Sequence, residues 1–240
     1  MTESSSTGVG MVARLAAILT ELVGETSTFV RLCEAGRRMV EADAAALTVA
    51  YADRGRVTVA WTNEEAQVLE DLQTVAGEGP TIDAITTGTT VVTRLDADHL
   101  ASWPLLSQHL DRIPGDGVVM AIPLVASGVP LGALTVRASA TTAERLRVDA
   151  AEFVGASLTA AILHDIEVGG SDAAVERALL LEAEVHRATD MVVAQVGVRP
   201  EDALALLRAQ AFARDVPLQQ VAHDIVEGRI DFREFTIEGD

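Results

Sequence analysis

Apolar side chains recur every three or four residues along several stretches of the chain, and this spacing predicts amphipathic helices. Residues 10–23 show it first, with Val12, Leu15, Ile18, Leu19 and Leu22 on one face. The same spacing predicts further helices at about 27–41, 64–75, 96–110 and 143–166. A short helix over 80–87 is predicted instead by its ends, with Pro80 in the first turn and Gly88 as the stop. Beyond these the apolar spacing predicts three more helices, over 173–196, from Pro200 and from Pro217 to Gly228.

Runs rich in β-branched residues lie between these helices and predict strands. Residues 44–63 contain two such runs around a turn at 53–55, and residues 90–96 contain one. Residues 118–136 carry no charge, a pattern that also occurs in membrane spans. Pro123, Gly128 and Pro130 divide this stretch into two runs joined by a turn, so we interpret 118–138 as a buried hairpin and expect no membrane contact.

Helices on both sides of several antiparallel hairpins predict an α+β domain, and everything after it reads as helical. Paired glycines at 169–170 indicate a linker. The predicted organisation is a disordered tail at 1–9, a sheet domain at 10–166, a linker at 167–172, a three-helix domain at 173–228 and a tail at 229–240.

The long helices at the two ends of the sheet domain predict a homodimer, because each has an apolar stripe available for a second copy. A seam of Ala174, Ala178, Leu181, Val185, Ala188 and Val192 further predicts a short coiled coil or a packed helix pair within 173–196.

Charge limits the possible partners. The chain has 36 acidic residues against 18 basic ones, a formal net charge of −18, and every basic residue is Arg. Contact with a polyanion needs clustered positive charge, so any nucleic-acid contact must be local. The N-terminus lacks the basic start and apolar run of a signal peptide, and we expect a cytoplasmic protein.

The first part of the chain resembles a GAF domain, a six-stranded sensory fold that binds small ligands and mediates dimerisation. The resemblance covers about residues 11–166 and depends on "GEGPTIDAITTG" at 77–88, "VVTRLD" at 91–96, "WPLLS" at 103–107 and "IPLVASGVPLGALTV" at 122–136. This order is similar to that of the bacterial GAF domains that precede an ANTAR domain.

The second part, about 173–228, resembles ANTAR, the three-helix RNA-binding module of bacterial transcription antiterminators. "EDALALLRAQA" at 201–211 matches the middle-helix pattern at Ala203, Leu207, Arg208 and Ala211. The first helix departs from the family: Thr189 stands where Lys is usual, and Asp190 where Gly is usual. Together the two halves imply a regulator of transcription antitermination that binds an RNA hairpin.

Guanidinium groups can bind phosphate or stack on an unpaired base, and this chemistry selects the candidate RNA contacts. They are Arg187, Thr189, Arg199, Arg208 and Arg214, with Arg208 at the family's Leu-Arg position. Residues 171–240 hold 7 Arg against 14 acidic residues, a net of −7. Two alternatives therefore stay open: the arginines are ordinary surface residues, or the module has lost RNA binding and mediates protein interaction or dimerisation.

A ligand pocket between the sheet and its helices is the expectation for the sensory domain. Its candidate polar lining is Tyr51, Asp83, Thr86, His99 and Trp103. Alternatively, Asp83 caps the short helix after Gly79, or the domain is a dimeriser that binds no ligand. The sequence has no phosphate loop, no H-x-x-x-H and no C-x-x-C, so we expect neither an enzyme nor a cofactor or metal.

Overall fold

The computed structural model describes residues 3–25, 27–51, 55–113, 115–169 and 172–235. The centre of the first domain is an antiparallel sheet in the order β2-β1-β5-β4-β3. Its strands are β1 (Ala44–Ala50), β2 (Arg56–Trp61), β3 (Val91–Arg94), β4 (Gly117–Ala126) and β5 (Val129–Ser139). Within the described residues the sheet has five strands, one fewer than the resemblance implied.

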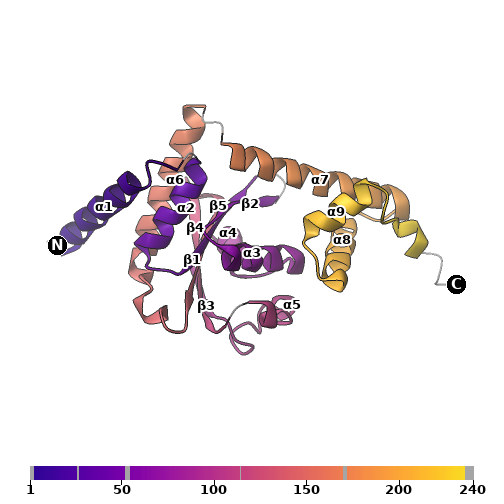
Figure 1. Ribbon diagram of the computed structural model, residues 1–240, viewed down its shortest axis with the longest axis horizontal. Helices are drawn as coiled ribbons and strands as arrows, with labels where there is room; N and C mark the ends of the chain where they lie inside the picture. The colour runs from indigo at the N-terminus through magenta and orange to yellow at the C-terminus, as the bar shows by residue number, and fades with distance from the viewer. Residues whose placement is uncertain (1–2, 26, 52–54, 114, 170–171, 236–240) are drawn as a thin grey trace.

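Two layers of helix cover this sheet (Figure 1). On one face lie α2 (Thr28–Met39) and α6 (Ala151–Glu167), with α1 (Glu3–Glu21) packed on α2. On the other lie α3 (Glu64–Ala76) and α4 (Pro80–Thr87), while the short α5 (Pro104–Ser107) packs against α3. The alternation of strand side chains separates two cores, because neighbouring residues point to opposite faces.

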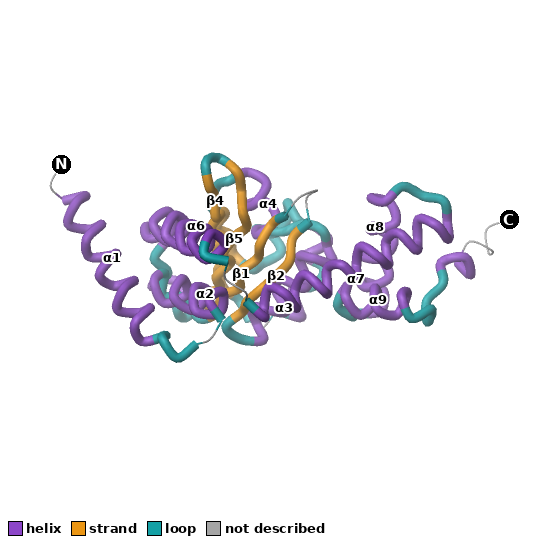
Figure 2. The backbone as a smooth tube through the Cα atoms, turned by 90° about the horizontal axis from the view of Figure 1, so that it is seen from above, coloured by secondary structure: helices purple, strands orange, loops and turns teal. Residues whose placement is uncertain are grey.

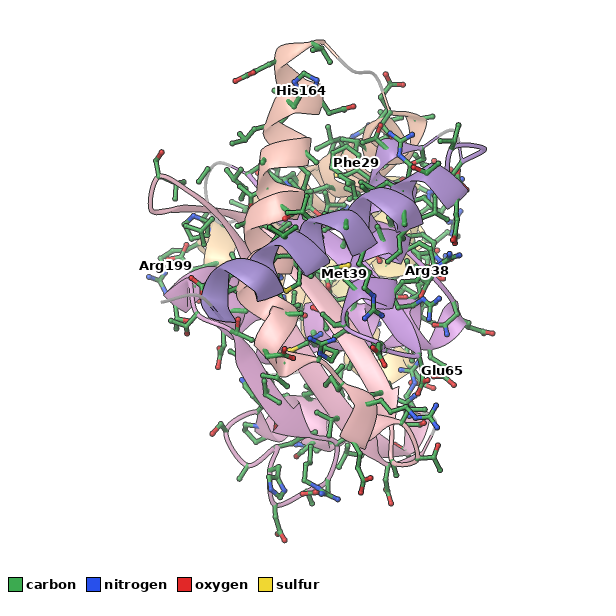
Figure 3. All side chains as sticks on the ribbon, turned by 90° about the vertical axis from the view of Figure 1, so that its left-hand side faces the viewer. Phe29, Arg38, Met39, Glu65, His164 and Arg199 are labelled. Atoms are coloured by element: carbon green, nitrogen blue, oxygen red, sulfur yellow. The ribbon has the colours of Figure 1, made fainter. Side chains whose placement is uncertain are left out.

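The larger core lies between the sheet and the α2/α6 layer and contains Leu47, Met120 and Leu134. Figure 3 shows the side chains of this layer, with Phe29 and Met39 labelled near the two ends of α2. Both are buried, with 5% and 1% of their surfaces exposed. The apolar spacing of α2 therefore directs one whole side of the helix onto the sheet.

Close approach of β1 and β5 depends on Gly132. A Cβ at this position would lie 2.1 Å from the carbonyl oxygen of Thr48, closer than any real contact. Gly132 pairs with Val49 in the strand register. Only glycine permits the two backbones to approach in this way.

The C-terminal helices α7 (Ala173–Val196), α8 (Pro200–Arg214) and α9 (Leu218–Val226) form a bundle at the opposite end of the molecule from α1 (Figure 2). Pro200 begins α8, and Asp215 ends it in the left-handed conformation. The bundle core contains fully buried residues from all three helices, among them Val192, Leu207 and Ile225. We call α7–α9 the C-terminal bundle.

The bundle and the sheet domain share α7. Ala178, in the first half of this helix, belongs to the core between sheet and helices, whereas Val185, Ala188 and Val192 belong to the bundle core. At the start of α7, Asp172 accepts hydrogen bonds from the Ser27 hydroxyl (2.9 Å) and the Phe29 amide (3.2 Å). One rigid helix thus joins the two parts. Leu181, placed on the predicted seam, is instead 42% exposed.

The structure corrects three predicted helix boundaries. The helix predicted over 10–23 begins at Glu3, inside the expected tail, and ends at Glu21. The helix predicted over 96–110 is broken: Pro104 begins α5, and a 3-10 turn follows at Leu110–Arg112. The helix predicted from residue 143 begins only at Ala151, after 3-10 turns at Ala143–Arg145 and Val148–Ala150.

Some predicted segments lie outside the described residues: most of the turn at 53–55, and parts of the linker and of both tails. A final 3-10 turn, Phe232–Phe235, packs on α7. Among the described helices, none has the length and hydrophobicity required to cross a bilayer.

Candidate functional site

A buried polar network fills the space between the sheet and α3/α4. Its centre is Glu70 on α3, whose side chain is fully enclosed. The hydroxyls of Thr81 and Thr48 donate to its carboxylate at 2.7 and 3.1 Å, and the Gln73 amide donates at 3.0 Å. The Thr81 hydroxyl also lies 2.6 Å from that of Thr135 on β5. The network therefore ties two helices to two strands.

Burial raises the pKa of Glu70, because a charged carboxylate loses its hydration inside the domain. The hydrogen bonds from Thr81 and Thr48, and the positive charge of Arg56, act in the opposite direction. The carboxyl group of Glu70 is therefore held in place by hydrogen bonds in a setting where its charged form is costly.

Two of the five predicted pocket residues are in contact. Trp103, which precedes α5, donates its indole N–H to Asp83 of α4 at 3.1 Å. This bond holds the loop before α5 against α4. Asp83 thus connects two elements instead of capping its own helix, whose N-cap is Gly79.

The other three predicted pocket residues lie elsewhere. Thr86 is exposed and donates to the carbonyl of Ile82 one turn earlier. His99 is exposed and bonded to Asp96 at 2.7 Å. Tyr51 follows β1, beside α7, where its ring centroid lies 6.4 Å from that of His186. Burial raises the Tyr51 pKa, and Glu182 of α7 raises it further.

The C-terminal bundle docks against the α3 side of the sheet domain (Figure 1). Val75 of α3 is buried within the apolar core of the bundle. The rings of His109 and Phe212 meet edge-to-face at 4.3 Å. Arg112 and Asp215 form an ion pair at 2.5 Å. We call these contacts the docking interface; they combine apolar burial, ring packing and charge.

Arg208 lies at the docking interface. A Cβ on Gly77, the C-terminal cap of α3, would lie 3.0 Å from Nη1 of Arg208. The guanidinium therefore sits at the end of α3, where the helix dipole is negative. Burial lowers the Arg208 pKa, and the positive charge of Arg56 lowers it further. Its Nε is buried without a hydrogen-bond partner among the described residues.

The other four predicted RNA-contact residues differ in whether an ion pair or hydrogen bond already occupies their side chains. Arg199 pairs with Asp202 at 3.0 Å, and Arg214 pairs with Asp224 at 2.9 Å. Thr189 donates to the carbonyl of Val185 within α7. Arg187 is exposed and has no ion pair within the described part of the chain. The structure thus places the five residues in four different environments.

Comparison with known proteins identifies the sheet domain. The model of the GAF domain family matches residues 24–163, more than half of the chain. The chain belongs to the GAF family. Residues 24–163 run from just before α2 into α6, so the match spans the whole sheet with the helices of both faces. The C-terminal bundle lies outside it.

Solved structures similar to this chain include two GAF domains of phosphoenolpyruvate-protein phosphotransferases. The one from Coxiella burnetii has 18% identity and a TM-score of 0.48, with 68% of this chain and 99% of that chain covered. The one from Acinetobacter has 16% identity and a TM-score of 0.42, with coverages of 67% and 98%. Comparison with curated proteins gives no match.

Sequence reasoning missed the polar network of the GAF domain and the docking interface. Glu70 and Gln73 appear on the predicted helix as ordinary polar residues, since nothing local shows that the sheet covers them. Val75 ends the helix predicted over 64–75, but the sequence does not show the second domain that buries it. Among the described residues no group of three His, Cys, Asp or Glu side chains is arranged to hold a metal ion.

Proposed function

We propose that this GAF protein is a signalling regulator whose C-terminal bundle binds an RNA hairpin and so influences transcription termination. The observation that carries the proposal is the position of Arg208, the residue that the ANTAR resemblance assigns to RNA. Arg208 is half-buried at the docking interface, against Gly77 of the GAF domain. A change in the GAF domain that loosens docking would release a cation for phosphate binding.

The energetics of Arg208 favour such a release. A buried N–H without a partner costs about 1–3 kcal/mol relative to one that is solvated or paired. The Nε of Arg208 is in this state, and Arg56 adds repulsion. These costs offset part of the free energy that the apolar contacts contribute to docking. A modest change in free energy in the GAF domain can therefore shift the population from the docked to the undocked arrangement. No catalytic step is part of this proposal.

The second candidate function is a protein-interaction or dimerisation module that does not bind RNA. The pairing of Arg199 and Arg214 with Asp202 and Asp224 supports it, because paired arginines offer less charge to phosphate. The predicted homodimer stays a prediction under both functions. Val9 and Val12 of α1 and Ile166 of α6 are exposed by 71%, 57% and 64%, and they offer apolar surface for it.

A gel shift with a panel of RNA hairpins at low salt separates the two candidates. Four proteins are compared: the wild type, Arg208→Ala, the double variant, and Val75→Asp, which places a charge in the bundle core from the GAF side. If docking occludes Arg208, Val75→Asp binds RNA at least about tenfold more tightly, equivalent to about 1.4 kcal/mol. Adding Arg208→Ala to Val75→Asp removes that gain.

Arg145→Ala provides the control, since Arg145 is exposed, lies outside the bundle and forms no ion pair in the described chain. Circular dichroism checks that the helices of each variant are intact. Absence of a shift at low salt for both the wild type and Val75→Asp would contradict RNA binding and leave the interaction module as the function.

A further inference from the structure

A cavity of about 210 Å³ lies between the GAF domain and the C-terminal bundle, next to the docking interface. The GAF side of its wall includes Arg56 and Trp61 of β2 and Asp71 of α3. The bundle side includes Leu181 and Glu182 of α7 and Pro217 before α9. The site is separate from the sheet face under α4, which the Glu70 network fills.

Arg56 lies in the cavity wall and carries an unsatisfied donor. Its Nη2 is buried and has no hydrogen-bond partner among the described residues. No ion pair of Arg56 is found within 4 Å in the described chain either; Glu70 and Glu182 act on it only at longer range. Native proteins rarely leave such a group unpaired, and a buried one usually meets water or a bound group. Because Arg56 lies in the wall of the cavity, a small movement of its side chain brings the guanidinium into reach of a group bound there.

The other walls define the chemistry of the occupant. A guanidinium binds a carboxylate through two parallel N–H···O bonds. Asp71 and Glu182 line the same cavity and repel a second negative charge, so a dianion such as phosphate is disfavoured. Trp61, Leu181 and Pro217 offer apolar surface to the rest of the molecule. A single carboxylate on a short apolar body complements all of these walls.

We propose that the cavity lined by Arg56, Trp61 and Leu181 binds a small monocarboxylate, with Arg56 as the anion-binding residue. Because the walls come from both parts of the chain, the ligand contacts both only when the bundle is docked. Binding therefore stabilises the docked arrangement by mass action. The inference rests on docking and not on RNA binding.

Tryptophan fluorescence tests the site directly. The chain has two tryptophans, so Trp103→Phe leaves Trp61, in the cavity wall, as the reporter. The probes are straight-chain acids from acetate to hexanoate, titrated at constant ionic strength. We expect a saturable change in Trp61 emission with butanoate or a longer acid. The matched amides, which lack the charge, and inorganic phosphate should give none.

Variants assign the binding to Arg56. Arg56→Gln should weaken the response to the acids at least tenfold, whereas Arg145→Gln, at an exposed position, should leave it unchanged. If Arg56→Gln does not fold, Leu181→Phe serves instead: it fills the cavity from the exposed side of α7 and should block the acids. Titration of the wild type by calorimetry covers the case in which Trp103→Phe perturbs the fold.

Three results would overturn the site: no saturable response to any acid in the tryptophan variant and the wild type, an equal response to acid and amide, or binding that survives both Arg56→Gln and Leu181→Phe. In the wild type, bound butanoate should also slow hydrogen exchange in α8 and α9 at least twofold. Failure of the RNA gel shift leaves each of these readouts unaffected.

Discussion

Arg112 and Asp215 form an ion pair across the two parts of the molecule, with Nη1 and Oδ1 2.5 Å apart. Their side chains are 34% and 67% exposed, so solvent screens the pair and it contributes about 0.2–1 kcal/mol. We expect Arg112→Glu to speed amide hydrogen exchange in α8 and α9 while the urea midpoint of the GAF domain stays nearly constant. Arg145→Glu is the control, and equal exchange in both variants would contradict a role in docking.

Asp71 makes stability depend on pH. Burial raises its pKa from 3.8 to about 6, and the charge of Glu70 adds to the rise, while Arg112 opposes it. The folded protein then binds this proton more tightly than the unfolded chain. The contribution is therefore present below pH 3.8 and is lost as the pH rises to about 6, and it amounts to at most about 3 kcal/mol.

The substitution Asp71→Asn should remove this contribution of Asp71 to the pH dependence of stability. The variant should be more stable than the wild type at pH 8 by about 1–3 kcal/mol and about equal to it near pH 3.5, because the amide has no charge to bury. Urea unfolding at both pH values measures the difference. Asp98→Asn, at an exposed position, should change neither value. A gain for Asp71→Asn that is the same at both pH values would show that titration is not its cause.

Glu70 is predicted to matter as a hydrogen-bond acceptor more than as a charge. Glu70→Gln retains an acceptor for the Thr81 hydroxyl, whereas Glu70→Leu leaves the donors of Thr81, Thr48 and Gln73 to find others. Each buried donor without a partner costs about 1–3 kcal/mol. Glu70→Leu should therefore lower the free energy of unfolding by several kcal/mol more than Glu70→Gln. Thermal melts of the two variants measure it, and similar melting temperatures would contradict it.

Gly132 and Gly128 offer a matched pair of glycine substitutions in the β4–β5 hairpin. Gly132→Ala brings a methyl group to 2.1 Å from the Thr48 carbonyl and forces β1 and β5 apart. Gly128 has a φ of +81° but open space around its Cβ position, so Gly128→Ala costs only backbone strain, about 1–2 kcal/mol. We expect Gly132→Ala to prevent folding or to destabilise far more than Gly128→Ala, as judged by soluble yield and urea midpoint.

The periodicity of apolar residues predicted the type and bounds of an element wherever its immediate neighbours in the chain bury it. The hairpin at 118–138 is β4 and β5, and the helices predicted at 27–41 and 173–196 correspond to α2 and α7 within two residues. Where apolar spacing and a proline favoured different structures, as around Pro104, the predicted helix was broken. The apolar spacing continued through 96–110, but proline removes a backbone donor, and its ring blocks the preceding turn.

The candidate pocket shows the limit of local reasoning. Asp83 and Trp103, 20 positions apart, do contact each other, yet Tyr51 lies beside α7 on another side of the sheet. The polar residues that occupy the sheet face, Glu70 and Thr135, carry no local signal. Their burial depends on how closely α3 and α4 approach the strands, which is a property of the packed layers.

The sequence by itself determined an α+β sheet domain and the helices that follow it, because strand and helix periods and the positions of glycine and proline are local properties. Tertiary structure alone decided that Arg208 faces Gly77, that Arg56 faces a cavity and that Val75 enters the bundle core. These outcomes follow from the docking of two cores, one in the GAF domain and one in the bundle, along α3. The free energy of that contact is shared among residues far apart in the chain, so no single segment encodes it.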